Sequence, residues 1–183
     1  MGPSLPFPLQ TPENPTAPSR ELWDSILDGI RMDRPGFTHV ALPGVFGVRA
    51  GVKLEEQTLE HYKRIVDMAD AQAMERCTQI ITYFDFTEHL THLGKEFEIP
   101  VMVLHGDADQ GMPYDASTKL IETLIPRTEA KIYKTAGHGK LTPPSHRRIR
   151  VLIVETGLYL THAQQVINDL LAFARQEKGK GEL

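Results

Sequence analysis

Cysteine is almost absent from this 183-residue chain, in which Cys77 is the only one. A single cysteine excludes an intrachain disulfide framework and any zinc site built from several cysteines. Cys77 lies in a helix-like stretch between charged and polar residues, and we interpret it as an inert thiol in the core or at its boundary.

Excess positive charge and long hydrophobic runs are also absent. The chain has 20 Lys and Arg against 24 Asp and Glu, and its net charge is −4, so it has no general positive field to attract nucleic acid or an anionic membrane. It contains no run of about 20 apolar residues to span a bilayer, and its N-terminus lacks the pattern of a secretory signal. We therefore expect a cytoplasmic protein that binds neither nucleic acid nor membranes.

The chain does have the composition of a soluble globular protein, with 40% hydrophobic and 24% charged residues. Its length suits one ordinary domain or a piece of a larger one. Residues 1–19 hold 6 of the 13 prolines, which disfavours helix and central strand and predicts an extended lead-in. Residues 20–94 are predicted to be mainly helical, beginning with a helix that Ser19 caps and Pro35-Gly36 ends.

The chain changes character after residue 94. Ile99–Leu104 is a short apolar run of the kind found in a strand buried on both faces of a parallel sheet. A polar loop, a helix over 114–125, a second strand over 130–134 and another loop follow, and a final helix begins after Thr161. This order predicts a right-handed parallel crossover unit.

Ionisable residues lie where both predicted strands end. Asp107 and Asp109 follow the first strand, and His138 follows the second. The carboxyl ends of parallel strands meet at one edge of a sheet, so we expect the carboxylate of Asp109 and the imidazole of His138 to touch. Such a pair suits an acid-base relay, because the carboxylate fixes the tautomer of the imidazole and stabilises its charged form. The glycines beside His138 are expected to allow a sharp turn and an accessible ring.

Three segments, IPVMVLHGDADQGMP, KTAGHG and LYLTHAQQVINDLLAFA, resemble the α/β-hydrolases, and within them the esterase and cofactor-free haloperoxidase-like branch. The resemblance implies the C-terminal portion of that α/β fold: a helical cap segment, the last two parallel strands and their flanking helices, with an incomplete sheet. It implies Asp109 as the triad acid and His138 as the triad base, whereas Asp107 shapes the turn. It also gives the boundaries: a Pro-rich lead-in over 1–19, a cap-like region over 20–94, and a core part over 95–183 with an atypical insertion over 140–157.

The nucleophile of that family is missing from the sequence. It sits on a G-x-S-x-G elbow, and no serine of this chain, nor Cys77, has the flanking glycines. We therefore expect a truncated or inactive ester or acyl hydrolase that would act on a small-molecule ester or acyl substrate if completed, with no metal or organic cofactor. Trp23 and the apolar residues of the cap are expected to pack between helices or, in a full enzyme, to line an acyl pocket.

Two alternatives stay open for the function. The chain could be a noncatalytic fragment or pseudoenzyme that associates with another chain, or with itself, through an exposed sheet edge. It could also be a metallohydrolase that uses His105, Asp107, Asp109 and His138, although these do not follow a known ligand spacing.

Residues 140–157 interrupt the family pattern between GHG and LYLTHAQQ. Gly139-Lys140 and Thr156-Gly157 can be encoded by codons that contain an intron start and an intron end, so one hypothesis is a retained in-frame intron. The alternative is a genuine surface insertion in which Ile149 to Val154 adds an edge strand.

Overall fold

The computed structural model describes residues 4–138, 151–154, 158 and 162–176. Its elements in chain order are α1 (Arg20–Val45), η1 (Val48–Ala50), α2 (Glu56–Asp67), α3 (Ala71–Tyr83), α4 (Thr87–Glu96), β1 (Val101–Gly106), η2 (Tyr114–Ala116), α5 (Thr118–Leu124), β2 (Glu129–Tyr133), β3 (Val151–Val154) and α7 (Ala163–Gln176). Within these ranges, no helix is both long and apolar enough to cross a membrane.

The strands form a small parallel sheet in the order β2-β1-β3. β1 and β2 are the two parallel strands that the sequence predicts, and their last partners are Gly106 and Tyr133. β3 pairs with the other side of β1, where Leu104 lies opposite Val154. It falls in the 140–157 segment at the place where the insertion hypothesis puts an edge strand, and the rest of that segment lies outside the described residues.

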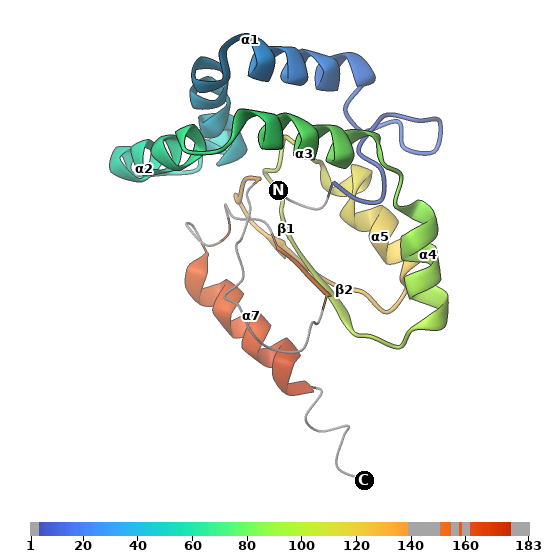
Figure 1. Ribbon diagram of the computed structural model, residues 1–183. Helices are drawn as coiled ribbons and strands as arrows, with labels where there is room; N and C mark the ends of the chain where they lie inside the picture. The colour runs from blue at the N-terminus through green and yellow to red at the C-terminus, as the bar shows by residue number, and fades with distance from the viewer. Residues whose placement is uncertain (1–3, 139–150, 155–157, 159–161, 177–183) are drawn as a thin grey trace.

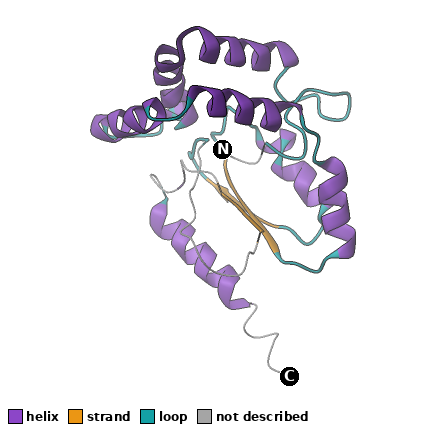
Figure 2. Ribbon diagram, in the orientation of Figure 1, coloured by secondary structure: helices purple, strands orange, loops and turns teal. Residues whose placement is uncertain are grey.

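The core lies on both faces of β1, because this strand is buried along its whole length. Met102 and Leu104 pack on one face against Val166 and Phe173 of α7. Val101 and Val103 pack on the other face with Leu90 of α4, Ile121 of α5 and Ile125, the residue that follows α5. Figures 1 and 2 show the resulting layers, with α7 on one side of the strands and α4 and α5 on the other. The continuous apolar run of β1 is thus explained by cover on both faces.

Helices α1, α2 and α3, here called the cap helices, lie beyond one end of the sheet (Figure 1). Ser19 caps α1 as predicted, since its side chain accepts from the backbone N–H of Leu22. The predicted end of this helix at Pro35-Gly36 is wrong. The helix kinks at Asp33, which has φ −152° and ψ 81°, and then resumes as far as Val45.

The side chain of Asp33 explains why the chain becomes helical again. Its Oδ1 accepts from the backbone N–H of Gly36 at 3.1 Å, as an N-cap residue does. Pro35 therefore stands in the first turn of the second segment, where its missing N–H removes no helical hydrogen bond. Pro35, which the sequence analysis takes as the end of the helix, instead lies at the beginning of its second segment.

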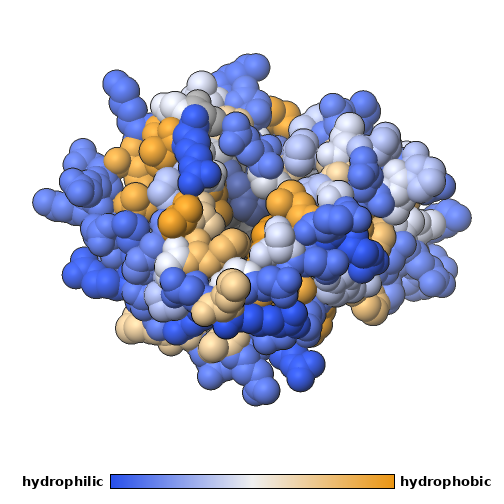
Figure 3. Space-filling view, turned by 90° about the horizontal axis from the view of Figure 1, so that it is seen from above, coloured by the Kyte–Doolittle hydropathy of each residue, from blue (hydrophilic) through white to orange (hydrophobic). Residues whose placement is uncertain are grey.

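The cap helices bury few of their side chains. α2 has no buried residue, and Thr82 is the one buried residue of α3. Cys77 of α3 is exposed, so the predicted place in the core or at its boundary is wrong, because α3 packs through one side only. Seen from above, the molecule shows hydrophobic side chains gathered around a hollow, with polar side chains around them (Figure 3).

Candidate active site

Asp109 and His138 meet at the carboxyl edge of the sheet. The Nδ1 atom of His138 lies 2.7 Å from Oδ2 of Asp109. The side chain of Asp109 is fully buried and that of His138 is 11% exposed, so the contact lies largely out of water. The contact that the sequence predicts is confirmed. Because the carboxylate accepts at Nδ1, it favours the tautomer whose Nε2 is unprotonated.

The loop after β1 holds Asp109 in place through its backbone. The second carboxylate oxygen, Oδ1, accepts from the N–H groups of Gly111 at 2.9 Å and Met112 at 2.8 Å. Both oxygens of Asp109 therefore have defined partners, which fixes the rotation of the carboxylate. Charge-assisted hydrogen bonds of this kind are stronger than neutral ones.

Asp107 ties the two loops together, which confirms its interpretation as a turn-shaping residue. Its Oδ1 accepts from the backbone N–H of Thr135 at 2.5 Å, and its own N–H donates to the carbonyl of Tyr133 at 2.9 Å. Thr135 has a positive φ of 56°, a conformation that non-glycine residues seldom adopt. The carboxylate of Asp107 thus holds the turn that leads to His138.

His105 lies beneath Asp109 and is completely buried. Its Nδ1 is 2.7 Å from Oγ1 of Thr118, and its Nε2 is 4.0 Å from Oδ2 of Asp109. Burial lowers the pKa of His105, and the charge of His138 acts in the same direction, while Asp109 and a backbone hydrogen bond with Met112 oppose the change. The expectation that His105 packs or bonds locally is confirmed, and a neutral imidazole supports the Asp109 loop from below.

Gly137, the residue before His138, is required for a close approach and not for a special turn. A Cβ on Gly137 would lie 2.5 Å from the backbone nitrogen of Gly47, which follows α1 with φ 72°. Gly137 itself is not among the residues with positive φ. The side chain of His138 is 11% exposed and lines the cavity described below, and Gly139, the other glycine beside it, lies outside the described residues.

Gly106 permits a second close approach between the loops. A Cβ on Gly106 would lie 2.2 Å from the carbonyl oxygen of Ala136, and that oxygen accepts from the N–H of Ala108 at 3.0 Å. The loops after β1 and β2 therefore touch backbone to backbone, which brings Asp109 and His138 within reach of each other.

A metal site is not formed by the described residues, in which no three His, Cys, Asp or Glu side chains come together so as to hold an ion. His105, Asp109 and His138 lie close together, but both nitrogen-to-carboxylate relations are those of hydrogen-bonded or packed groups. Asp107 is directed to Thr135 instead.

A cavity of about 460 Å³ opens over His138, between the cap helices and the loops after β1 and β2. We call it the cap pocket. Its floor includes His138, Gln110 and Gly111, and its wall is made mostly by apolar side chains of α1, among them Trp23, Ile26, Ile30, Phe37 and Ala41. The pocket agrees in size with small-molecule sites, which span roughly 300–1,000 Å³.

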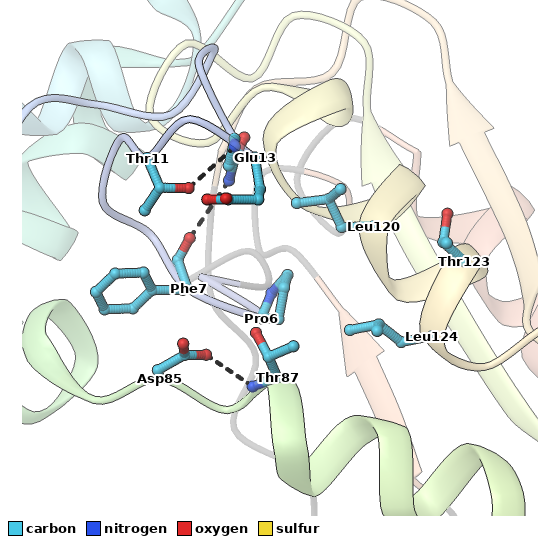
Figure 4. A pocket seen from close by; sticks show the side chains of 10 residues that line it. Pro6, Phe7, Thr11, Glu13, Asp85, Thr87, Leu120, Thr123 and Leu124 are labelled. Carbon is cyan, nitrogen blue, oxygen red and sulfur yellow. Dashed lines mark hydrogen bonds between the residues drawn. The ribbon is translucent and has the colours of Figure 1, made fainter.

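A second cavity of about 370 Å³ lies away from this pair (Figure 4). Phe7 of the N-terminal segment stands on one side of it, and Leu120 and Leu124 of α5 stand on the other (Figure 4). The carboxylate of Asp85 is engaged at the start of α4, where it accepts from the N–H of Thr87 at 2.8 Å. This cavity has no histidine in its lining, so it does not contain the pair of Asp109 and His138.

Sequence reasoning missed Thr118, Gln110 and Gly47. Gly47 and Thr118 act through contacts that join distant positions, with Gly137 and with His105 respectively. Gln110 lines the cap pocket and directly follows Asp109 in the HGDADQG loop. This adjacency in sequence is the one signal that could have pointed to it. Nothing in the sequence around Thr118 or Gly47 marks them for the site.

No protein-family model matches the chain. Among curated proteins, it is 32% identical over 146 residues to the non-heme chloroperoxidase CPO-A1 of Kitasatospora aureofaciens, a match that covers 78% of this chain and 50% of the relative. It is 29% identical over 172 residues to the bifunctional esterase/perhydrolase DCH of Acinetobacter calcoaceticus, which covers 93% of this chain and 54% of the relative. The chain spans about half the length of the curated relatives it matches.

Solved structures give the same fold. A bromoperoxidase from Bacillus anthracis superposes with a TM-score of 0.75 at 22% identity, over 94% of this chain and 55% of the other. An esterase from Exiguobacterium antarcticum superposes with a TM-score of 0.73 at 13% identity, over 94% and 54%. The chain therefore has the α/β-hydrolase fold, and the curated proteins that it resembles are non-heme haloperoxidases and esterases.

Proposed function

We propose that this chain supplies the acid and base of an ester or acyl hydrolase site. His138 is the general base and Asp109 is the residue that orients it. The observation that carries the proposal is the 2.7 Å contact between Nδ1 of His138 and Oδ2 of Asp109, buried under the cap pocket. The esterase and haloperoxidase relatives support the same chemistry.

The role of each group follows from where its protons sit. With the Nδ1 proton directed to Asp109, the lone pair on Nε2 is available to take a proton from a nucleophile and later to return it to the leaving group. Asp109 stabilises the imidazolium that forms in between. This cycle involves no metal and no organic cofactor.

The nucleophile and the donors for an oxyanion have to come from a polypeptide segment outside these 183 residues, because no G-x-S-x-G pattern occurs in them. A base and its orienting acid accomplish little without those partners. We therefore propose that the chain by itself does not turn over esters.

Hydrolysis of p-nitrophenyl butyrate tests both statements. The purified chain is expected to give no turnover above buffer, and turnover that disappears in His138→Ala would contradict the second statement. A chimera that joins the N-terminal half of the Kitasatospora chloroperoxidase to this chain is expected to hydrolyse the ester, with kcat reduced by about 10³-fold or more in His138→Ala. His92→Ala is the matched control, because His92 is an exposed histidine on α4 that pairs with Glu96 on the same helix, away from the cap pocket. Equal activity of the two variants would overturn the role of His138.

A second candidate is a noncatalytic protein that associates with another chain or with itself through the sheet. It is favoured by β3, whose sequence Val-Leu-Ile-Val carries no charged residue to discourage edge pairing. Size-exclusion chromatography separates the two ideas: a compact monomer counts against association, and a dimer that Ile153→Lys converts to monomer supports it. Cytoplasmic location stays a prediction from the sequence.

A further inference from the structure

β2 is built as the outer strand of the sheet. Its sequence, Glu-Ala-Lys-Ile-Tyr, holds two charged residues. Nζ of Lys131 lies 2.9 Å from Oε1 of Glu129, and the two side chains are 39% and 32% exposed. Ile132 is 41% exposed. Charged side chains are typical of outer strands, because they discourage pairing with a further strand. We therefore do not expect the sheet to continue beyond β2.

β1 is built as an inner strand. It has no Asp, Glu, Lys or Arg, all six of its residues are buried, and helices pack on both of its faces. Such a strand needs a neighbour on each side, because unpaired backbone groups in a buried strand are costly. β2 occupies one side of β1, in register from Met102 to Gly106. The rest of a larger sheet can therefore attach only on the other side, where β3 lies from Val101 to Leu104.

β3 comes from a part of the chain that does not follow the family pattern. It lies within 140–157, the segment that interrupts the α/β-hydrolase motifs, and it is in register with four residues of β1. The matches with this chain cover 50% and 54% of two curated relatives. A relative that lacks the segment has to take this neighbour of β1 from the half of its length that this chain does not span. β3 thus stands where a strand of that other half is expected.

The spacing of strands makes the two occupants of this position alternatives to each other. Neighbouring strands lie about 4.8 Å apart. If the other half of the fold attached outside β3, it would stand one strand further from Asp109 and His138, in the loops after β1 and β2. A nucleophile has to come within about 2.6–3.2 Å of Nε2 of His138 to give up its proton. One intervening strand is therefore enough to prevent the contact.

We propose that β3 holds the edge of β1 in the absence of the other half of the fold, and that it leaves this edge when a strand of that half pairs with β1. The partner is the N-terminal half of an α/β-hydrolase, whether it precedes this chain or is a separate polypeptide. The inference rests on the proposed function in one respect, the supply of the nucleophile by a segment outside these residues. β3 is then an internal competitor of the partner, and it keeps the nucleophile away from His138 for as long as it stays on β1.

Hydrogen exchange of the backbone amides tests the proposal in the full chain and in its chimera with the N-terminal half of the Kitasatospora chloroperoxidase. In the chain alone, the amides of 151–154 that bond to β1 are expected to be protected. In the chimera they are expected to exchange about tenfold faster or more, while the amides of β1 stay protected in both proteins. Equal protection of β3 in the two proteins, or no protection of β3 in the chain alone, would overturn the proposal.

A pair of prolines in β3 tests the competition without the chimera. Proline has no backbone N–H, and Leu152→Pro together with Ile153→Pro removes the donors of two successive residues, so that one of them faces β1. A tagged N-terminal half of the same chloroperoxidase, co-expressed with the chain, is expected to retain about threefold more of this variant than of the unmodified chain, because the edge of β1 is free in a larger fraction of molecules.

Arg147→Pro together with Arg148→Pro is the matched control, because these positions precede β3 in the same segment. This variant is expected to be retained like the unmodified chain. Equal retention of the two proline variants would contradict the proposal. The exchange experiment uses neither variant, so it decides the matter even where the prolines in β3 prevent folding.

Neither measurement depends on ester turnover, so the outcome is separate from that of the hydrolase test. Loss of protection in β3 together with an inactive chimera would retain the exchange of strands and reject the role of His138. An active chimera in which β3 stays as protected as in the chain alone would retain that role and reject the exchange of strands.

Discussion

The loops at the edge of the sheet and the cap helices above them are built in opposite ways. β1 is buried at every residue and the side chain of Asp109 is fully buried, whereas α2 buries none of its residues. The acid-base pair is therefore fixed by the same contacts that form the core. The cap helices bury fewer of their side chains, so we expect them to be less stable than the loops that hold the pair.

The largest loss of stability is expected when Asp109 is replaced. Asp109→Ala removes the acceptor of two backbone N–H groups and the partner of His138, and it is expected to lower the free energy of unfolding by about 3 kcal/mol. Urea titration followed by circular dichroism measures the loss. Asp109→Asn keeps an oxygen for the two N–H groups and should lose less; equal losses would show that the backbone contacts do not hold the loop.

The next largest loss of stability is expected at Gly137, where the histidine loop meets the end of the cap helix α1. Gly137→Ala places a Cβ at 2.5 Å from the backbone of Gly47, where neither side can yield cheaply, and we expect a destabilisation of about 2 kcal/mol. Gly44→Ala is the matched control, since nothing lies within 4 Å of its Cβ position. Because Gly44 is within α1, this change is expected to stabilise the protein by about 0.5–1 kcal/mol. A harmless Gly137→Ala would mean that α1 does not press on the histidine loop.

A smaller loss of stability is expected at Thr118, whose hydroxyl contacts the buried His105 next to Asp109. Thr118→Val leaves Nδ1 of the buried His105 without its hydroxyl partner and is expected to cost about 1–3 kcal/mol in urea unfolding. Thr123→Val on the same helix changes an exposed threonine whose hydroxyl donates to the Lys119 carbonyl, and an effect below about 0.5 kcal/mol is expected. Losses of the same size at both positions would reject a special role for Thr118.

His105 also predicts the direction of pH dependence. Because burial lowers its pKa in the folded chain, the unfolded chain binds more protons below the ordinary histidine pKa of about 6.5, and stability falls as pH decreases through that region. In His105→Gln, part of the difference in unfolding free energy between pH 7.5 and pH 5.5 should disappear. An unchanged difference would mean that His105 is not held neutral.

The smallest effect is expected on the outer surface of the cap. Arg31 of α1 lies 2.7 Å from Glu75 of α3, and its side chain is 48% exposed. Exposed ion pairs contribute little, because water and salt screen them. Arg31→Ala should therefore be indistinguishable from the unmodified chain in the same urea titration, and a loss as large as that of Thr118→Val would show that the cap is held more firmly than its exposure indicates.

The sequence predicts the features that depend on neighbouring residues. The apolar run of β1 and the Asp109 and His138 loops follow from local pattern, and the resemblance assigns the fold. The kink at Asp33 was missed because the capping contact to Gly36 turns a stop signal into a start. Gly47 and Thr118 were missed because their roles exist only after distant segments meet, at Gly137 and at His105 respectively.

The tautomer of His138 tests the central claim most directly. In a long-range ¹H–¹⁵N spectrum of the labelled chain at pH 8, with the signal assigned by comparison with His138→Gln, we predict a proton on Nδ1 and a bare Nε2. In Asp109→Ala at the same pH, His138 should lose its preference for a proton on Nδ1, because the carboxylate that accepts from this nitrogen is gone. A proton on Nε2 of His138 in the unmodified chain would contradict the account, because that nitrogen could then not accept a proton as a base.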